Sequence, residues 1–163
     1  MATQGKNLSA YDNTEFPKAH SYRVGIVVSE WNDEITSSLH QGAKEALIDC
    51  GVPESAIFSH WVPGSFELPI GAQMVLEADS SIDAVICLGN VIRGETAHFD
   101  YVCEGCAIGI KDVSLRYNKP VMFGVLTDDN IEQSRARSGG SMGNKGIEAA
   151  IAALKLIKLQ KSL

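Results

Sequence analysis

The chain has 163 residues, with 14 basic against 20 acidic side chains and a formal charge of −6, which excludes a general basic surface for nucleic acid or anionic membranes. Its length is that of one domain, and 45% hydrophobic residues are enough for a single core. No apolar run approaches the roughly 20 residues that cross a bilayer, and the start lacks the pattern of a signal peptide, so we expect a soluble, cytoplasmic protein.

The first two segments predict a loosely attached arm and then a single α/β domain. Residues 1–21 are polar and have no sustained period, whereas the domain covers residues 22–163. Residues 22–29 form an apolar, β-branched run typical of a buried parallel strand, and a helix follows, which Gly51 and Pro53 end. Trp31 lies between the two, where α/β sheets bind ligands. Its indole is either a packing lid or a stacking platform for a flat ring.

The second strand is expected over residues 56–62, with a helix beginning near Phe66. Ser65 and Glu67 lie between them, together with loop amides that could bind a polyol. A capping serine followed by a first-turn glutamate explains the same residues, and this stretch alone favours that structural interpretation.

The third strand, residues 82–88, joins an anion-binding turn. The run stops at Gly89, and helical spacing begins at Thr96. A glycine-containing turn at a helix start presents free backbone N–H groups at the positive end of the helix dipole, which suits a phosphate or carboxylate. His98 lies in the first turn of that helix.

The last part of the chain predicts a fourth strand at residues 120–127, a short helix at 130–137 and a final helix at 147–159. The alternation of side chains along this expected strand, taken alone, predicts that Phe123 is a core residue. Residues 138–146 are glycine-rich without matching a Walker A sequence, and are either a linker or part of an anion site supplied with charge by Arg135, Arg137 and Lys145.

Four strands alternating with helices predict a doubly wound, flavodoxin-like three-layer sandwich with a four-stranded parallel sheet. Its strand ends bring an aromatic ring, polar side chains, an anion-binding turn and an imidazole to one rim. Such a set predicts a site for a flat heterocycle with a hydroxylated chain that meets a phosphate.

The four cysteines are sparse, and three fall in segments expected in the core, which indicates a reducing compartment without a disulfide framework. Cys103 and Cys106, with His98 upstream, allow a zinc site of the deaminase kind as a weaker alternative. Both cysteines lie on the apolar stripe of the helix and the upstream H-x-E is absent, so we expect no metal.

Four motifs make the chain resemble the lumazine synthase family over residues 22–159. They are VPGSFELP at 62–69, GNVIRGETAHFDY at 89–101, FGVLT at 123–127 and GNKG at 143–146. The resemblance implies a cofactor-free condensation of 5-amino-6-ribitylaminouracil with 3,4-dihydroxy-2-butanone 4-phosphate to 6,7-dimethyl-8-ribityllumazine in riboflavin biosynthesis.

The resemblance also assigns roles to individual residues and moves Phe123 from the core to the site. His98 is implied as the proton shuttle, and an imidazole suits this because it titrates near neutral pH. The backbone N–H of Glu95, rather than its carboxylate, is expected to face the anion. The implied aminouracil contacts are Trp31, Ser65, Phe66, Glu67, Asn90, Val91, Ile92 and Phe123; the phosphate contacts are Glu95, Thr96 and Arg137, supported by Lys145 and Glu148.

The family builds its site between subunits, so the resemblance implies a homopentamer, either alone or assembled into decamers or sixty-subunit shells, with Phe123 and Arg137 supplied by a neighbour. Riboflavin synthase is an implied partner. Two alternatives remain at this point: a module that binds a flavin without turnover, and a structural shell subunit with a decayed site.

Overall fold

The computed structural model describes residues 9–163. The part of the expected arm formed by residues 1–8 lies outside them. The long strands are β1 (Val24–Ser29), β2 (Ile57–Val62), β3 (Ala84–Ile92) and β4 (Val121–Asp128). The α-helices are α1 (Asp33–Asp49), α2 (Leu68–Ala78), α3 (His98–Tyr117), α4 (Ile131–Arg137) and α5 (Lys145–Gln160). Short 3-10 helices are η1 (Asn13–Glu15), η2 (Ala19–Ser21), η3 (Glu54–Ala56) and η4 (Ser65–Glu67), and a small hairpin consists of β5 (Ser138–Gly140) and β6 (Gly143–Asn144).

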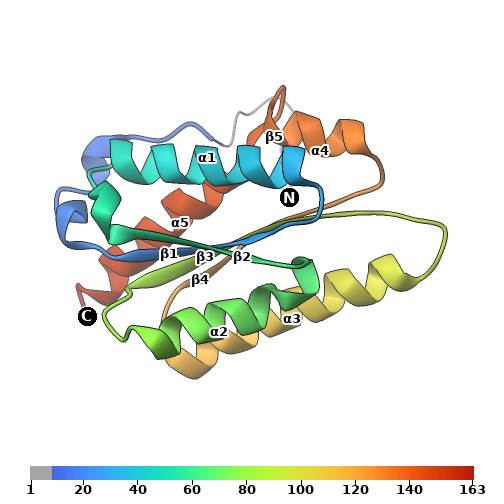
Figure 1. Ribbon diagram of the computed structural model, residues 1–163. Helices are drawn as coiled ribbons and strands as arrows, with labels where there is room; N and C mark the ends of the chain where they lie inside the picture. The colour runs from blue at the N-terminus through green and yellow to red at the C-terminus, as the bar shows by residue number, and fades with distance from the viewer. Residues whose placement is uncertain (1–8) are drawn as a thin grey trace.

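The four long strands form one parallel sheet in the order β2-β1-β3-β4. Helices α1 and α5 cover one face, and α2 and α3 cover the other (Figure 1). This confirms the doubly wound three-layer sandwich. The chain leaves β1 toward β2 and then returns to β3 on the opposite side, so a crevice is expected where the carboxyl ends of β1 and β3 diverge.

Burial follows the sequence pattern of the central strands. Every residue of β1 is buried, and β3 is buried until its last two residues, as uninterrupted apolar runs require when helices cover both faces. The sheet separates two apolar clusters, one under α1 and α5 and one under α2 and α3. Among the helices of residues 9–163, none is long and apolar enough to cross a membrane.

The described part of the N-terminal segment packs more tightly than predicted. Phe16 and Ala19 are only 3% and 1% exposed and belong to the core cluster under α1 and α5. The expectation of loose attachment is therefore wrong for residues 9–21, because two apolar side chains anchor a segment that is otherwise polar. The domain boundary at residue 22 stays a prediction.

Strand β3 is longer than the apolar run suggested. It continues through Asn90, Val91 and Ile92, which pair with Leu126, Thr127 and Asp128 of β4. The turn is thus confined to residues 93–97, and α3 begins at His98 rather than at Thr96. The expected turn was too long because ladder pairing with a neighbouring strand continues past the glycine and asparagine that locally disfavour a strand.

The glycine-rich segment before α5 is an antiparallel hairpin. Strands β5 and β6 pair with each other, and Gly139 and Gly143 adopt left-handed φ angles of 115° and 86°. Those angles favour glycine, which explains the composition that resembled a phosphate loop. Asn144 then caps α5 through its Oδ1, which accepts from the N–H groups of Gly146 and Ile147.

Candidate active site

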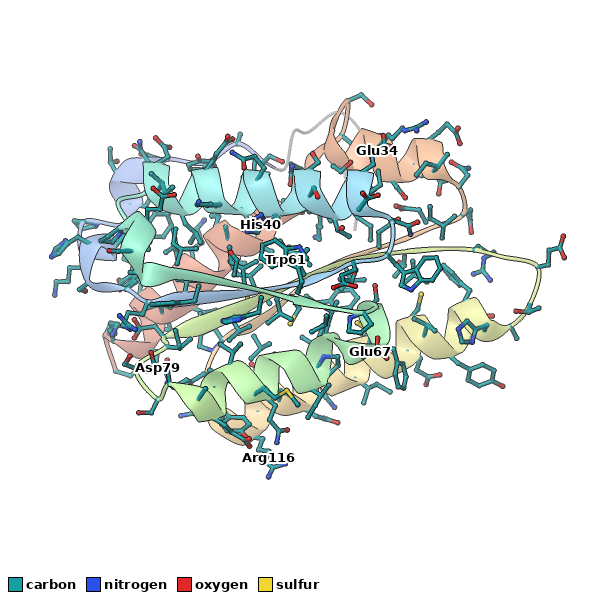
Figure 2. The ribbon with its side chains drawn as sticks, viewed as in Figure 1. Glu34, His40, Trp61, Glu67, Asp79 and Arg116 are labelled. Carbon is teal, nitrogen blue, oxygen red and sulfur yellow. The ribbon has the colours of Figure 1, made fainter. Side chains whose placement is uncertain are left out.

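A cleft of about 630 Å³ opens at the carboxyl ends of β1, β2 and β3. Glu67, on η4, lies at this end of the sheet, on the side covered by α2 and α3 (Figure 2). The structure gathers eight of the predicted site residues in the wall of the cleft, and these are Trp31, Ser65, Phe66, Glu67, Asn90, Val91, Ile92 and His98.

Trp31 lies in the loop after β1 and is 73% exposed. This exposure rules out the packing-lid interpretation and leaves an apolar ring surface open to a flat ligand. A Cβ built on Gly64 would lie 3.5 Å from Cδ1 of Trp31 and 3.0 Å from Oε2 of Glu67. The aromatic ring and the carboxylate therefore flank the same glycine, and Gly64 allows both to approach the backbone.

Ser65 and Glu67 do not act as helix caps. Gly64 and Glu67 precede η4 and α2, and neither helix start has a side-chain capping bond. The Ser65 hydroxyl is buried and has no hydrogen-bond partner among residues 9–163. A Cβ on Gly89 would lie 2.6 Å from that oxygen, so glycine there leaves space for the hydroxyl. The wall of the cleft therefore contains a residue whose buried hydroxyl has no partner in the described part of the chain.

His98 is the first residue of α3 and is exposed. Its backbone N–H donates to Oγ1 of Thr96 at 3.4 Å, and the structure gives its imidazole no bond to any described residue. Tyr101 and Val102, three and four positions later, line the same cleft. Sequence reasoning missed both, although helical spacing places them on the face that carries His98.

Asn32 and Asn90 join two strand ends beneath the cleft. Asn32 has a left-handed φ of 60° and lines the cleft, and its Nδ2 donates to the backbone oxygen of Asn90 at 3.3 Å. Asn90 itself is 2% exposed. Asn32 and Gly64 were not predicted as site residues. The available signal for Asn32 was an asparagine directly before a helix, since asparagine tolerates the left-handed region.

The remaining predicted residues lie outside the cleft of this protomer. Glu95 and Thr96 are exposed in the loop that joins β3 to α3, which extends beyond the rest of the molecule at the right of Figure 1. Phe123, on the edge strand β4, is 37% exposed, so the core assignment from period was wrong. An edge strand has a neighbour on one side only, and Phe123 is not covered as Val121 and Val125 are.

Most cationic side chains near the cleft are already paired. Arg93 contacts Asp129 and Asp100 at 3.0 and 3.2 Å, and these hydrogen bonds, chiefly that to Asp129, raise the pKa of Arg93. Arg135 donates two bonds to Glu34, whose pKa this lowers. Glu34 lies at the end of α1 that faces α4 (Figure 2).

Two predicted cations remain. Lys145 pairs with Glu148 at 2.9 Å, and the supporting role beside Arg137 that the resemblance implied for these two residues stays a prediction. Arg137, the last residue of α4, is half-buried and makes no ion pair with any residue between 9 and 163. Arg137 therefore still has its charge available for an anion.

The cysteines do not form a metal site. Cys106 is fully buried, and burial raises the pKa of its thiol to about 12, which disfavours the thiolate that binds zinc. Over the described range, residues 9–163, no group of three or more His, Cys, Asp or Glu side chains is placed to hold a metal ion.

Comparison with known proteins agrees with this geometry. The family model described as 6,7-dimethyl-8-ribityllumazine synthase matches residues 21–161. Proteins with that name are 56% identical in Christiangramia forsetii, over 99% of this chain and 96% of theirs, and 56% identical in Flavobacterium johnsoniae, over 99% and 84%. A third, from Cytophaga hutchinsonii, is 54% identical over 96% and 98%. The chain therefore belongs to the 6,7-dimethyl-8-ribityllumazine synthase family, a family of transferases in riboflavin biosynthesis.

Proposed function

We propose that the protein condenses 5-amino-6-ribitylaminouracil with 3,4-dihydroxy-2-butanone 4-phosphate to give 6,7-dimethyl-8-ribityllumazine, phosphate and water. The observation that carries the proposal is the cleft itself, because one cavity collects Trp31, Glu67 and His98 from the ends of three different strands. A platform, a polar wall and an imidazole are the groups that a ribityl-substituted ring undergoing proton transfer needs.

Each part of the cleft has a role in this proposal. The uracil ring stacks on Trp31 and contacts the β3 residues Asn90, Val91 and Ile92, while the ribityl chain reaches η4. The unpartnered Ser65 hydroxyl and the Glu67 carboxylate supply a donor and acceptors for its hydroxyl groups. Holding both substrates in one cavity makes the condensation effectively unimolecular, which supplies much of the rate.

His98 is the proton shuttle in this mechanism. The uracil amine attacks the ketone to give a carbinolamine and then an imine; loss of phosphate, tautomerisation and ring closure follow. Each step moves a proton, and an exposed imidazole free of bonds to the described chain can accept and return one. The phosphate is assigned to the backbone at Glu95 and Thr96, at the amino end of the 20-residue helix α3.

A second protomer completes the phosphate site in our proposal. Arg93 and Arg135, the arginines nearest in sequence to the phosphate loop and to Arg137, are held by carboxylates, and Arg137 does not line the cleft of its own protomer. A bound phosphate would thus lack a counter-charge within one chain. In the proposed assembly the projecting β3–α3 loop meets Arg137 and Phe123 of a neighbouring copy, as the family resemblance implies.

Exposed apolar side chains at both edges of the sheet support such an assembly. At one edge, Trp61 and Met74 are 52% and 60% exposed beside a groove of about 430 Å³ between β2 and α2. At the other, Phe123 and Leu115 are 37% and 72% exposed on β4 and α3. Two different apolar edges fit a head-to-tail ring, and the resemblance implies five subunits.

Product analysis tests the proposed reaction. Purified protein incubated with the two named substrates is expected to form the lumazine and release phosphate in equal amounts, measured by mass spectrometry and a phosphate assay. A protein that binds flavin but forms no lumazine would instead be the binding module considered above. The cytoplasmic location and the partnership with riboflavin synthase, the enzyme class that consumes the product, stay predictions.

A further inference from the structure

A buried chain of hydrogen bonds ends at the wall of the cleft. The Ser134 hydroxyl on α4 donates to Oδ2 of Asp128 at 2.8 Å, and Nδ2 of Asn90 donates to the Ser134 hydroxyl at 2.9 Å. The three residues are 7%, 0% and 2% exposed, in the order Asp128, Ser134, Asn90. Only Asn90 lines the cleft, so the other two reach a ligand only through it.

The donors and acceptors in this series of hydrogen bonds fix the orientation of the Asn90 amide. The Ser134 hydroxyl carries one hydrogen, and its two available acceptors are the Asp128 carboxylate and, at 3.5 Å, the backbone oxygen of Asn130. Both groups only accept, so the hydrogen points away from Asn90. The hydroxyl must therefore accept from Asn90, and only the NH₂ end of an amide can donate.

The orientation leaves the amide oxygen of Asn90 without a partner. Oδ1 is buried and makes no hydrogen bond within residues 9–163, and leaving such an acceptor unpaired destabilises the folded protein. The backbone oxygen of Asn90 already accepts from Nδ2 of Asn32, so Oδ1 is the unpaired acceptor of a residue that lines the cleft.

We propose that Asp128 and Ser134 are positioning residues that hold the Asn90 amide with its oxygen available to the ligand, so that the cleft selects a ring carrying an N–H donor. The inference rests on the proposed function, because the aminouracil ring has two such N–H groups. It adds a specificity determinant built from two residues outside the cleft.

Two substitutions separate orientation from packing. In Asp128→Asn the new amide can donate to the Ser134 hydroxyl, so the hydroxyl hydrogen can point toward Asn90. The Asn90 amide can then flip and accept that hydrogen through Oδ1. In Ser134→Ala the link is removed. Ser114→Ala is the matched control, since it removes a partly buried hydroxyl that donates to Lys119 O at 2.7 Å, near the start of β4 and away from the cleft.

The test is calorimetric binding of three probes to the full-length, assembled protein: the aminouracil substrate and its analogues methylated at ring N1 or N3. The wild-type protein and Ser114→Ala are expected to bind the substrate at least about tenfold more tightly than one of the two analogues. Asp128→Asn and Ser134→Ala should reduce that preference at least about fivefold, by weakening binding of the unmethylated probe.

The outcomes distinguish this inference from the proposed function. If the wild-type protein neither binds nor converts the aminouracil, both are overturned. If it does, but the variants keep the full preference or lose affinity for all three probes equally, only the positioning role is overturned. A general loss of folding would appear as a lowered melting temperature in Ser134→Ala, and Asp128→Asn, which conserves side-chain size, then decides the question by the same preference ratio.

Discussion

The side chains assigned to chemistry do little to hold the protein together. Trp31 is 73% exposed, and His98 is exposed with an imidazole that bonds to no described residue. Buried residues such as Asn90, in contrast, combine a place in the cleft wall with bonds that join strands. Substitution of Trp31 or His98 should therefore change activity with little change in stability, because surface substitutions away from packing usually cost less than about 0.5 kcal/mol of unfolding free energy.

His98→Ala is expected to lower kcat by about 10²-fold or more without abolishing turnover, since positioned acid–base groups contribute about 10²–10⁴-fold and the binding of two substrates remains. Steady-state kinetics on both substrates measures the loss. The control is His20→Ala, which removes another exposed imidazole from η2. Wild-type activity in His98→Ala would remove this residue from the mechanism.

At the scale of elements, polar side chains join the ends of helices and strands that the core alone would leave free. Asn144 lies between the β5–β6 hairpin and α5, where its Oδ1 accepts from Gly146 N at 2.8 Å and its Nδ2 donates to Ser38 O at 2.9 Å. Gly146 packs so closely against α1 that a Cβ there would lie 2.0 Å from the oxygen of Leu39. One asparagine thus fixes the contact between α5 and α1.

Asn144→Ala should lower the free energy of unfolding by about 1–2 kcal/mol, because it removes a helix cap. Asn144→Asp keeps the capping oxygen but cannot donate to Ser38 O, so it should lose less than the alanine variant. Chemical denaturation at pH 7 gives both values. Equal losses in the two variants would show that the link to α1, rather than the cap, carries the stabilisation.

A second polar junction makes stability depend on pH. Asp79, which is labelled in Figure 2, follows α2 and accepts hydrogen bonds from Ser81 and, at 2.9 Å, from Arg23, which precedes β1. These contacts, led by the Ser81 hydroxyl, lower the pKa of Asp79 to about 2. An unfolded aspartate titrates near pH 3.9, so the ionised carboxylate stabilises the folded state above about pH 4 and loses that effect as the pH falls toward 2.

Asp79→Asn should be less stable than the wild-type protein at pH 5, and the difference in melting temperature should shrink between about pH 4 and pH 2. Thermal unfolding followed by circular dichroism at several pH values measures it. Asp112→Asn, on the exposed face of α3, is the comparison for removal of one surface carboxylate. A difference that stays constant down to pH 2 would contradict the assignment.

At the scale of the whole molecule, the residues predicted for the site fall into two groups that lie apart in one chain. It has a cleft with His98 at one end of the sheet, and it carries Arg137 and Phe123 outside that cleft. Apolar side chains remain exposed at both sheet edges, on β2 with α2 and on β4 with α3. The ring that we propose, in which each copy completes its neighbour's cleft, would account for both features, since each copy would use one edge against each neighbour.

Mixing two impaired variants tests this arrangement. Arg137→Ala and His98→Ala should each be strongly impaired as uniform assemblies. After the two are unfolded, mixed in equal amounts and refolded together, about a quarter of the sites should contain both native residues if these come from different protomers. Activity that stays at the level of the separate variants would place His98 and Arg137 of one chain in the same site.

Residue patterns along the chain were sufficient for the layers of the fold and for most of the cleft. The apolar runs that became β1 and β3 are buried on both faces. Parallel strands place their carboxyl ends together, so Trp31, Glu67 and His98 could be expected at one rim before the strand order was known. The motifs at residues 62–69 and 89–101 carried the family resemblance without any coordinates.

Other features depended on contacts between segments distant in sequence. The burial of Phe16, the exposure of Phe123 on an edge strand and the extension of β3 to Ile92 follow from which neighbour lies beside each segment. The link from Asp128 through Ser134 to Asn90 spans 38 positions between its ends, and no local pattern marks it. Sequence specifies which groups are available because identity and period are local properties, whereas tertiary structure decides which buried group finds a partner, because that depends on distance in space.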